Sequence, residues 1–149
     1  MSEGQHLFQA SATWSEETKE GRLRSGSAAL DCVHTGAVEL GGKGGATNPE
    51  ELLMAAVSAC FVQTWAIFIG KLKLPIEKPV VDAECAVEKD PAGGFWISKI
   101  TVKPQVPAAL WGERRADVEK SLSLAEKYCI VSKAVRAPGR AFEVVPQVA

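Results

Sequence analysis

Apolar and polar residues alternate in several short stretches of the chain, a spacing typical of half-buried β-strands. Three such stretches occupy the first third of the sequence. Two more follow the apolar centre of the chain and are joined by a turn over 90–94, as in a hairpin. A last stretch lies near the end of the chain. The predicted strands are 7–14, 21–25, 28–35, 81–87, 95–102 and 141–145.

The longest apolar stretch, residues 52–69, is apolar on nearly every face and predicts a buried helix. Its length is close to that of a membrane-spanning helix. However, Ser58, Gln63 and Thr64 interrupt the stretch and acidic residues precede it. We therefore expect protein rather than lipid to surround this helix.

An amphipathic helix is predicted over 111–127, and a short helical piece over 132–135. With the strands, this order of elements is typical of an α+β fold. No internal repeat or low-complexity linker is present, so residues 1–149 are expected to form one domain. A sheet from one such chain covers only part of a helix that is apolar all round. We therefore predict an intimate homodimer.

Charge and the first residues of the chain limit the choice of partners. Seventeen basic and eighteen acidic residues leave a formal charge of -1, so no strong field attracts nucleic acid or an anionic membrane. The first six residues are polar and lack the apolar stretch of a secretory signal, so a cytoplasmic location is expected. In that reducing compartment, four cysteines indicate chemistry or packing rather than permanent disulfides.

Several common catalytic and binding motifs are missing. There is no Cys-x-x-Cys motif, and the only close pair of metal-ligating residue types is Cys32 with His34, so no zinc site is predicted. No Gly-x-Ser-x-Gly motif indicates a serine hydrolase. The glycine-rich residues 41–45 precede a helix but lack the Gly-Lys-Ser/Thr ending of a phosphate-binding loop.

Two cysteines have informative surroundings. Cys60 lies midway along the apolar helix, where packing is the ordinary role of an unpaired cysteine. Cys129 lies at the join between two helical pieces, where it is either an accessible thiol or a buried residue that seals a helix end. Cys32 and Cys85 fit the strand alternation and are interpreted as packing residues.

The start of the apolar helix allows two capping arrangements. If Asn48 is the N-cap, Pro49 occupies the first helical position and Glu51 is the capping partner, which leaves Glu50 free for another role. If Thr47 is the N-cap, Glu50 is itself the capping residue. The residues alone leave both arrangements open.

Residues 42–61, which run from the glycine-rich loop through Thr-Asn-Pro-Glu-Glu to Cys60, resemble the osmotically inducible protein C and organic hydroperoxide resistance (OsmC/Ohr) family. Residues 125–134 are similar to the second cysteine segment of that family. The order of elements also matches, so the resemblance covers nearly the whole chain. It implies an intertwined homodimer whose central helices are wrapped by antiparallel sheets, with active sites at the subunit interface.

The resemblance also implies that the protein reduces organic hydroperoxides. In this chemistry Cys60 is the peroxidatic thiol, Cys129 is the resolving thiol and Glu50 lies beside them. A thiolate attacks the peroxide, and the resulting sulfenic acid condenses with the second thiol to a disulfide. An external dithiol, in the family often a lipoylated protein, then reopens the disulfide. No bound cofactor or metal is expected.

A cation is expected beside Cys60. This residue lies about three turns inside its helix, where the helix dipole no longer lowers a pKa, whereas Cys129 precedes a short helix and looks like the easier thiolate. In the family, an arginine held by the glutamate stabilises the thiolate. A local alignment places Lys19 at that position, with Arg22 and Arg24 close by.

The chain departs from the family pattern at two positions. Lys19 keeps the positive charge but lacks the planar fork with which arginine grips a carboxylate. Ile130 stands where the family commonly has proline after the second cysteine, which predicts a looser local backbone. Phe61, Trp65 and Phe68 are candidates for lining an apolar substrate pocket, although aromatic residues on a buried helix more often form core.

The missing arginine supports a second hypothesis, a non-catalytic binding or redox-sensing dimer of the same fold. A third is a purely structural dimer with inert cysteines, whose thiols would resist alkylation in the native state.

Overall fold

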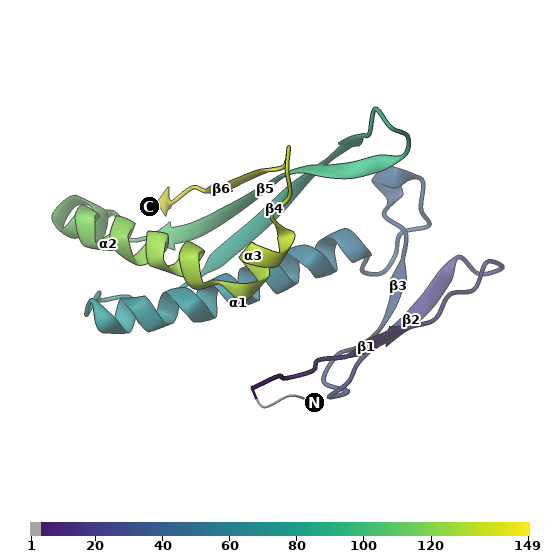
Figure 1. Ribbon diagram of the computed structural model, residues 1–149, viewed down its shortest axis with the longest axis horizontal. Helices are drawn as coiled ribbons and strands as arrows, with labels where there is room; N and C mark the ends of the chain where they lie inside the picture. Colours follow the sequence, from purple (N-terminus) through teal and green to yellow (C-terminus); the bar gives the residue numbers. More distant parts are fainter. Residues whose placement is uncertain (1–3) are drawn as a thin grey trace. The chain divides into compact units, whose positions relative to one another are not determined.

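The computed structural model describes residues 4–149 (Figure 1). The chain forms two compact units. The N-terminal unit ends at Leu52, and the C-terminal unit begins at Leu53. Helix α1 (Pro49–Lys71) begins in the first unit and continues in the second.

The N-terminal unit contains an antiparallel sheet of three strands in the order β1-β2-β3. The three predicted strands are therefore present, and the first is shorter than predicted. The elements of the unit are β1 (Ala10–Ala12), β2 (Glu20–Ser25), β3 (Asp31–Thr35) and a short 3-10 helix, η1 (Val38–Leu40).

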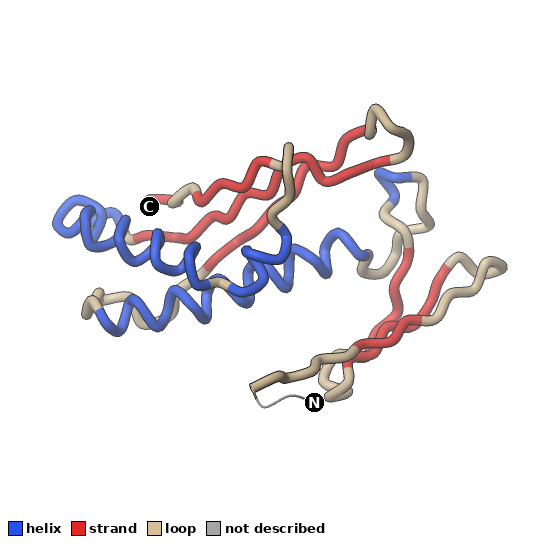
Figure 2. The backbone as a smooth tube through the Cα atoms, viewed as in Figure 1, coloured by secondary structure: helices blue, strands red, loops and turns tan. Residues whose placement is uncertain are grey.

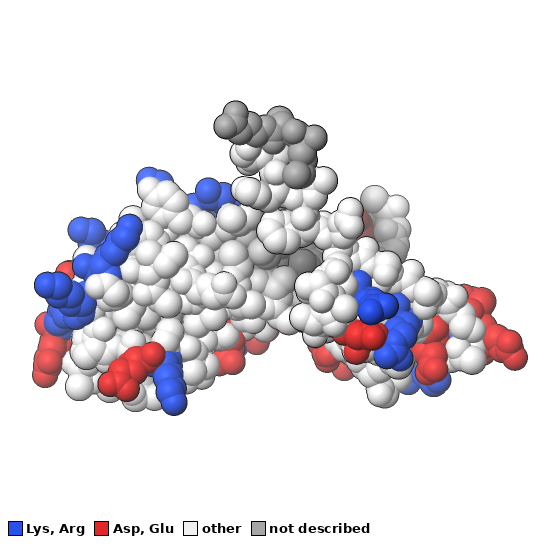
Figure 3. Space-filling view, turned by 90° about the horizontal axis from the view of Figure 1, so that it is seen from below, with Lys and Arg blue, Asp and Glu red and all other residues white. Residues whose placement is uncertain are grey.

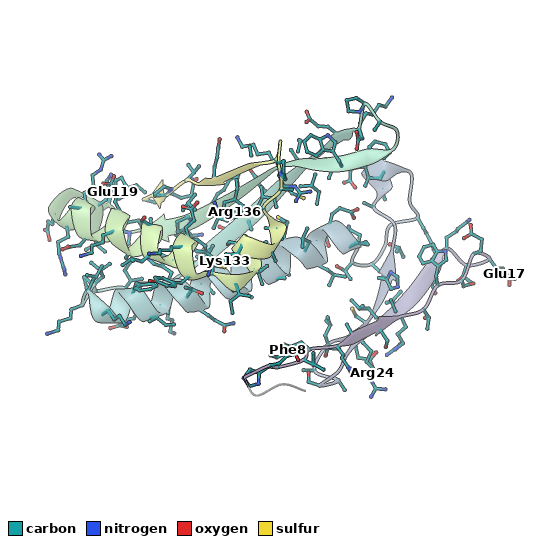
Figure 4. All side chains as sticks on the ribbon, viewed as in Figure 1. Phe8, Glu17, Arg24, Glu119, Lys133 and Arg136 are labelled. Carbon is teal, nitrogen blue, oxygen red and sulfur yellow. The ribbon has the colours of Figure 1, made fainter. Side chains whose placement is uncertain are left out.

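This sheet has one apolar face that the unit itself does not bury. Leu23 lies opposite Ala12 on one side and Cys32 on the other. The other face carries charged residues such as Arg24, which projects away from the sheet (Figure 4). Among residues 4–52 no apolar side chain is buried, and Phe8 is 94% exposed. Residues 4–52 therefore form no hydrophobic core of their own, and the apolar face of the sheet stays uncovered within this unit.

The C-terminal unit is built on a mixed sheet. Its central strand pairs with one antiparallel and two parallel neighbours. The helices lie along one face of this sheet (Figure 2). The elements after α1 are β4 (Val81–Lys89), β5 (Phe95–Val106), α2 (Ala108–Tyr128), α3 (Ile130–Val135), β6 (Ala141–Val144) and β7 (Gln147–Val148). The predicted α+β class is confirmed.

The core of the C-terminal unit contains buried residues from α1, α2 and β5. Phe61 and Trp65 of α1 are completely buried there, so both aromatic residues are core rather than pocket. The indole Nε1 of Trp65 donates a hydrogen bond of 2.9 Å to Ser121 Oγ, which itself donates to the carbonyl of Val118 at 2.7 Å. This buried hydrogen bond fixes α1 against α2, because leaving the indole N–H unpaired would be costly.

One face of α1 stays uncovered. The helix is long and apolar enough to cross a membrane, but one side of it forms the core just described. On its other side Ala55, Ala59 and Ala66 are exposed, and Ile67 is 55% exposed. Seen from below, the C-terminal unit shows a broad uncharged area, with charged side chains gathered toward its edge (Figure 3).

Among the boundaries that differ from the prediction, two have consequences for the sheet and for the cysteines. The sequence predicts that the second hairpin strand ends at Lys103-Pro104, yet β5 continues to Val106. Pro104 falls between Val102, which pairs with β6, and Gln105, which pairs with β7, so its missing N–H interrupts neither parallel pairing. The last short helix begins at Ile130, earlier than the predicted residue 132. This earlier start places its first turn directly after Cys129.

Candidate active site

The fold brings Cys60 and Cys129 into contact. Helix α1 presents Cys60 from its middle, and the join between α2 and α3 presents Cys129. The two side chains are hydrogen-bonded to each other as free thiols. Cys129 is 0% exposed, whereas Cys60 is only partly buried. A reagent in solution therefore reaches Cys60 first.

The first N–H groups of α3 point at these two sulfurs. The N–H groups in the first turn of a helix have no acceptor within the helix. Those of Ile130 and Val131 donate to the sulfur of Cys60, and that of Ser132 donates to the sulfur of Cys129. Cys129, the N-cap, has extended backbone angles (φ -68°, ψ 111°) that turn the chain from α2 into α3. The turn thus directs three donors to one pair of thiols.

These donors favour the thiolate of Cys60. Burial of its sulfur opposes ionisation, but the N–H of Val131 and the thiol of Cys129 act in the other direction. The N–H of Ile130 and the hydroxyl of Thr64 add to the same effect. The net result is a pKa of Cys60 below its ordinary value, because hydrogen bonds to the charged form outweigh desolvation.

Cys129 is shifted in the opposite direction. Burial raises its pKa, and although the hydroxyl and the N–H of Ser132 oppose this effect, the hydrogen bond to Cys60 and the charge there add to it. Cys129 therefore keeps its proton when Cys60 ionises. The expectation that Cys129 is the easier thiolate is wrong, because the N–H groups of Ile130 and Val131 reach the sulfur of Cys60, on a different helix.

A groove of about 740 Å³ opens beside Cys60. Its floor is a stripe of α1 that runs from Cys60 to Lys71 and includes Phe68. Residues of α2 and α3, including Tyr128 and Ile130, form its walls. Of the three aromatic candidates from the sequence, Phe68 alone lines this groove. Its mostly apolar lining is suited to an organic molecule.

In the N-terminal unit, Lys19 and Glu50 line a second cavity, of about 650 Å³. The side chain of Asn48 accepts the N–H of Glu51 at 2.9 Å, which identifies Asn48 as the N-cap of α1. The carboxylate of Glu51 accepts the hydroxyl of Thr47 at 3.3 Å. Glu50 is therefore not needed for capping. Its Oε2 is buried and has no hydrogen-bond partner among the described residues.

Two lysines line this second cavity. Lys19, at a positive φ of 56°, pairs with Glu16. Lys43, which the family resemblance does not single out, pairs with Glu20 at 2.9 Å. The sequence signal that could have identified Lys43 is its position within the glycine-rich loop that precedes α1. The cavity therefore offers two cations beside Glu50.

The other two cation candidates do not line this cavity. Arg22 forms an ion pair with Asp31 across the sheet at 2.7 Å. Arg24 projects outward from the same strand (Figure 4). Among residues 4–149, no group of three or more His, Cys, Asp or Glu side chains is placed to hold a metal ion.

The family match and the named relatives of this chain agree on one protein family. A family described as "OsmC-like protein" matches residues 42–143. An organic hydroperoxide resistance protein of Xanthomonas axonopodis pv. citri is 35% identical over 133 residues, which are 87% of this chain and 88% of that protein. The peroxiredoxin OsmC of Escherichia coli is 33% identical over 61% of this chain and 62% of its own length.

Solved structures agree on the fold. The crystal structure of an organic hydroperoxide resistance protein OsmC from Legionella pneumophila matches with a TM-score of 0.77. The match covers 99% of each chain at 24% sequence identity. At that identity the likeness supports the fold alone.

Replacing Ile130 with proline should remove one of the N–H donors to Cys60 while leaving the turn intact. The first helical position tolerates proline, and the extended Cys129 suits the residue before it. At a pH below the pKa of Cys60, we expect iodoacetamide to alkylate the variant more slowly, by roughly threefold to tenfold, because a hydrogen bond to a charged group is lost. The rate at Cys60 is measured by peptide mass spectrometry across a pH series.

Ile130→Val is the matched control, because it shortens the side chain but keeps the N–H. Its pH profile should coincide with that of the parent, while the midpoint of Ile130→Pro moves to higher pH. Coincident profiles for the two variants would show that the N–H of Ile130 does not stabilise the thiolate.

Proposed function

This chain belongs to the OsmC-like protein family, and on that premise we propose that it is a thiol peroxidase that reduces organic hydroperoxides to alcohols. The observation that carries the proposal is the hydrogen-bonded pair of Cys60 and Cys129, with opposite pKa shifts. A peroxidatic cysteine must ionise easily, be reachable, and lie within reach of a second thiol. Cys60 meets these requirements at the end of an apolar groove.

In the proposed reaction the Cys60 thiolate attacks the terminal oxygen of the hydroperoxide. The O–O bond breaks, the alkoxide takes up a proton and leaves as an alcohol, and Cys60 becomes a sulfenic acid. The sulfur of Cys129 then attacks the sulfur of Cys60. The S–O bond breaks, and the hydroxyl leaves as water with the proton of Cys129. The resulting disulfide has taken up the oxidising equivalents of the peroxide.

An external dithiol completes the cycle by two thiol–disulfide exchanges, which return both cysteines to the reduced state. We expect a small dithiol or a lipoylated protein as the reductant and the cytoplasm as the location, because a reducing compartment supplies such thiols. The whole sequence of steps runs on sulfur chemistry and needs no bound cofactor.

We propose that Lys19 supplies the cation that assists Cys60 and that Glu50 orients it. Two features support this role: both residues line one cavity, and Oε2 of Glu50 is buried with no hydrogen-bond partner among the described residues. A buried carboxylate oxygen without a partner is costly, and an ammonium group would satisfy it. Lys43, which lines the same cavity, is the alternative cation.

We propose that the protein works as a homodimer in which the whole chain acts as one domain. Two uncovered apolar surfaces support this assembly, the sheet face around Leu23 and the face of α1 that carries the exposed Ala55, Ala59 and Ala66. Exposed apolar areas of this kind are typical of interaction surfaces. Sedimentation equilibrium that gave the mass of a single chain, 15.9 kDa, at assay concentrations would contradict the homodimer.

A redox-sensing dimer is the second candidate function. It is favoured by the ion pairs of Lys19 with Glu16 and of Lys43 with Glu20, which leave neither lysine paired with Glu50. A sensor of this kind would form the Cys60–Cys129 disulfide once and recycle slowly.

The parent protein should consume cumene hydroperoxide through many turnovers when dihydrolipoamide is the reductant. Cys60→Ser should lower the rate by roughly a thousandfold or more, because the nucleophile is lost. Cys129→Ser should still reduce about one equivalent of peroxide but stop before the disulfide.

Lys19→Met should lower kcat/KM by on the order of tenfold to a hundredfold, because a stabilising charge is removed.

Lys43→Met is the matched control for Lys19→Met and should retain most of the activity. If Lys43→Met instead lowers kcat/KM and Lys19→Met retains most of the activity, then Lys43 and not Lys19 supplies the cation. Undiminished turnover in Cys60→Ser would contradict the peroxidase mechanism. A single stoichiometric oxidation of the parent, without turnover, would favour the redox sensor.

A further inference from the structure

We propose that the hydroxyl of Ser132 is a further catalytic group, which assists the two steps in which the sulfur of Cys129 carries negative charge. These steps are the closing of the Cys60–Cys129 disulfide and its reopening by the dithiol. The inference rests on the proposed function, because it concerns the cysteine pair of that cycle. The attack on the peroxide takes place at Cys60 and does not use Ser132.

Ser132 lies in the first turn of α3, three residues after Cys129. Side chains at this spacing share one face of a helix, and a helical side chain leans toward the N-terminus of its helix. The hydroxyl of Ser132 is therefore directed back toward Cys129. Both side chains are 0% exposed. The hydroxyl and the sulfur thus meet away from bulk water, where a hydrogen bond to a charged group is strong.

The pairing of the Ser132 hydroxyl differs from that of other helical hydroxyls in the C-terminal unit. A helical hydroxyl commonly donates to a carbonyl of the preceding turn. Ser58, Thr64 and Ser121 do so, with O···O distances of 3.1, 2.8 and 2.7 Å. Ser132 Oγ is buried and has no oxygen or nitrogen partner among residues 4–149. Its proton is available to the sulfur of Cys129, whose charged form it stabilises.

This hydrogen bond is stronger when Cys129 is ionised than in the resting state. A neutral thiol sulfur is a weak acceptor, so the buried hydroxyl is poorly satisfied while Cys129 keeps its proton. Once Cys129 becomes a thiolate, the same O–H group makes a charge-assisted hydrogen bond. An interaction that strengthens as charge develops lowers the barrier of the step in which the charge appears.

The first of the two steps closes the disulfide. In the resting pair, the charge on Cys60 is one of the causes that raise the pKa of Cys129. Oxidation of Cys60 to a neutral sulfenic acid removes that charge, whereas the hydroxyl and the N–H of Ser132 remain. Cys129 then ionises and attacks Cys60, and its proton leaves with the hydroxyl of Cys60 as water. Ser132 keeps its own proton.

The second step reopens the disulfide. The reductant reaches the sulfur of Cys60 from the groove, because Cys129 is enclosed. A thiolate of the dithiol attacks Cys60, the S–S bond breaks, and its electron pair leaves on Cys129, where Ser132 stabilises it. Exchange is faster when the leaving thiolate is more stable. Cys129 then takes up the proton of the second reductant thiol, which attacks the reductant's own sulfur and releases Cys60 and a cyclic disulfide.

Ser132→Ala tests the role of the hydroxyl, because it keeps the N–H and alanine is well suited to a helix. The first equivalent of cumene hydroperoxide should be consumed at the parent rate. Closing of the disulfide, and its reopening by dihydrolipoamide, should each be slower by roughly threefold to tenfold. Acid quenching and mass spectrometry follow both steps, at peroxide concentrations where the attack on peroxide is not limiting. An unchanged rate of closing or of reopening, or equal slowing of all three steps, would overturn the role of Ser132.

Ser123→Ala is the matched control, since Ser123 is exposed on α2 and the substitution is the same. All three rates should stay at the parent values. The parent itself gives a second readout that does not depend on how a variant folds. Reopening of its disulfide by 2-mercaptoethanol with excess iodoacetamide should leave the mixed disulfide on Cys60 and the alkyl group on Cys129. A mixed disulfide on Cys129 would overturn the inference.

Failure of the proposed function is distinguishable from failure of this inference. Without turnover of cumene hydroperoxide by the parent, the peroxidase function fails. The Cys60–Cys129 disulfide is then made with diamide, and its reopening by dihydrolipoamide is compared in the parent and in Ser132→Ala. The variant should again be slower by roughly threefold to tenfold. Equal rates of reopening would overturn the role of Ser132 independently of peroxide reduction.

Discussion

The donation of hydrogen bonds from the first N–H groups of α3 to two sulfur atoms is the interaction on which the candidate site depends. These groups lack acceptors within their own helix, so they must find partners elsewhere. The sulfur of Cys60 takes the donors of Ile130 and Val131, and the sulfur of Cys129 takes that of Ser132. The result is a pair of thiols in which one ionises early and the other keeps its proton.

The rest of the C-terminal unit holds this arrangement in place. The hydrogen bond between Trp65 and Ser121 fixes α1 against α2 inside the core. Because α3 follows α2 after a single residue, the same contact determines where the N–H groups of α3 meet Cys60. The partly buried position of Cys60 then leaves its sulfur open to the groove, while Cys129 stays sealed. Packing therefore leaves Cys60 accessible and Cys129 enclosed, which is the difference that the proposed mechanism requires of its two thiols.

Local sequence patterns were sufficient to predict most of the fold. Alternating apolar residues indicated the strands, and the apolar run around Cys60 indicated a core helix. Patterns within one segment could not show contacts between segments. Cys129 lies next to the N-terminus of a helix and Cys60 lies deep inside one, so the dipoles of their own helices favour Cys129, whereas the N–H groups that reach Cys60 come from α3. Ile130 indicated a looser backbone by itself, yet in the fold it contributes an N–H that proline lacks.

The central claim is that the thiolate of Cys60, stabilised by α3, is the group that attacks the peroxide. The most direct measurement adds one equivalent of cumene hydroperoxide to the reduced protein with excess dimedone, which traps sulfenic acid. Peptide mass spectrometry then locates the adduct. We expect dimedone on Cys60, with a higher yield in Cys129→Ser, where no thiol competes for the sulfenic acid. An adduct on Cys129 instead would contradict it.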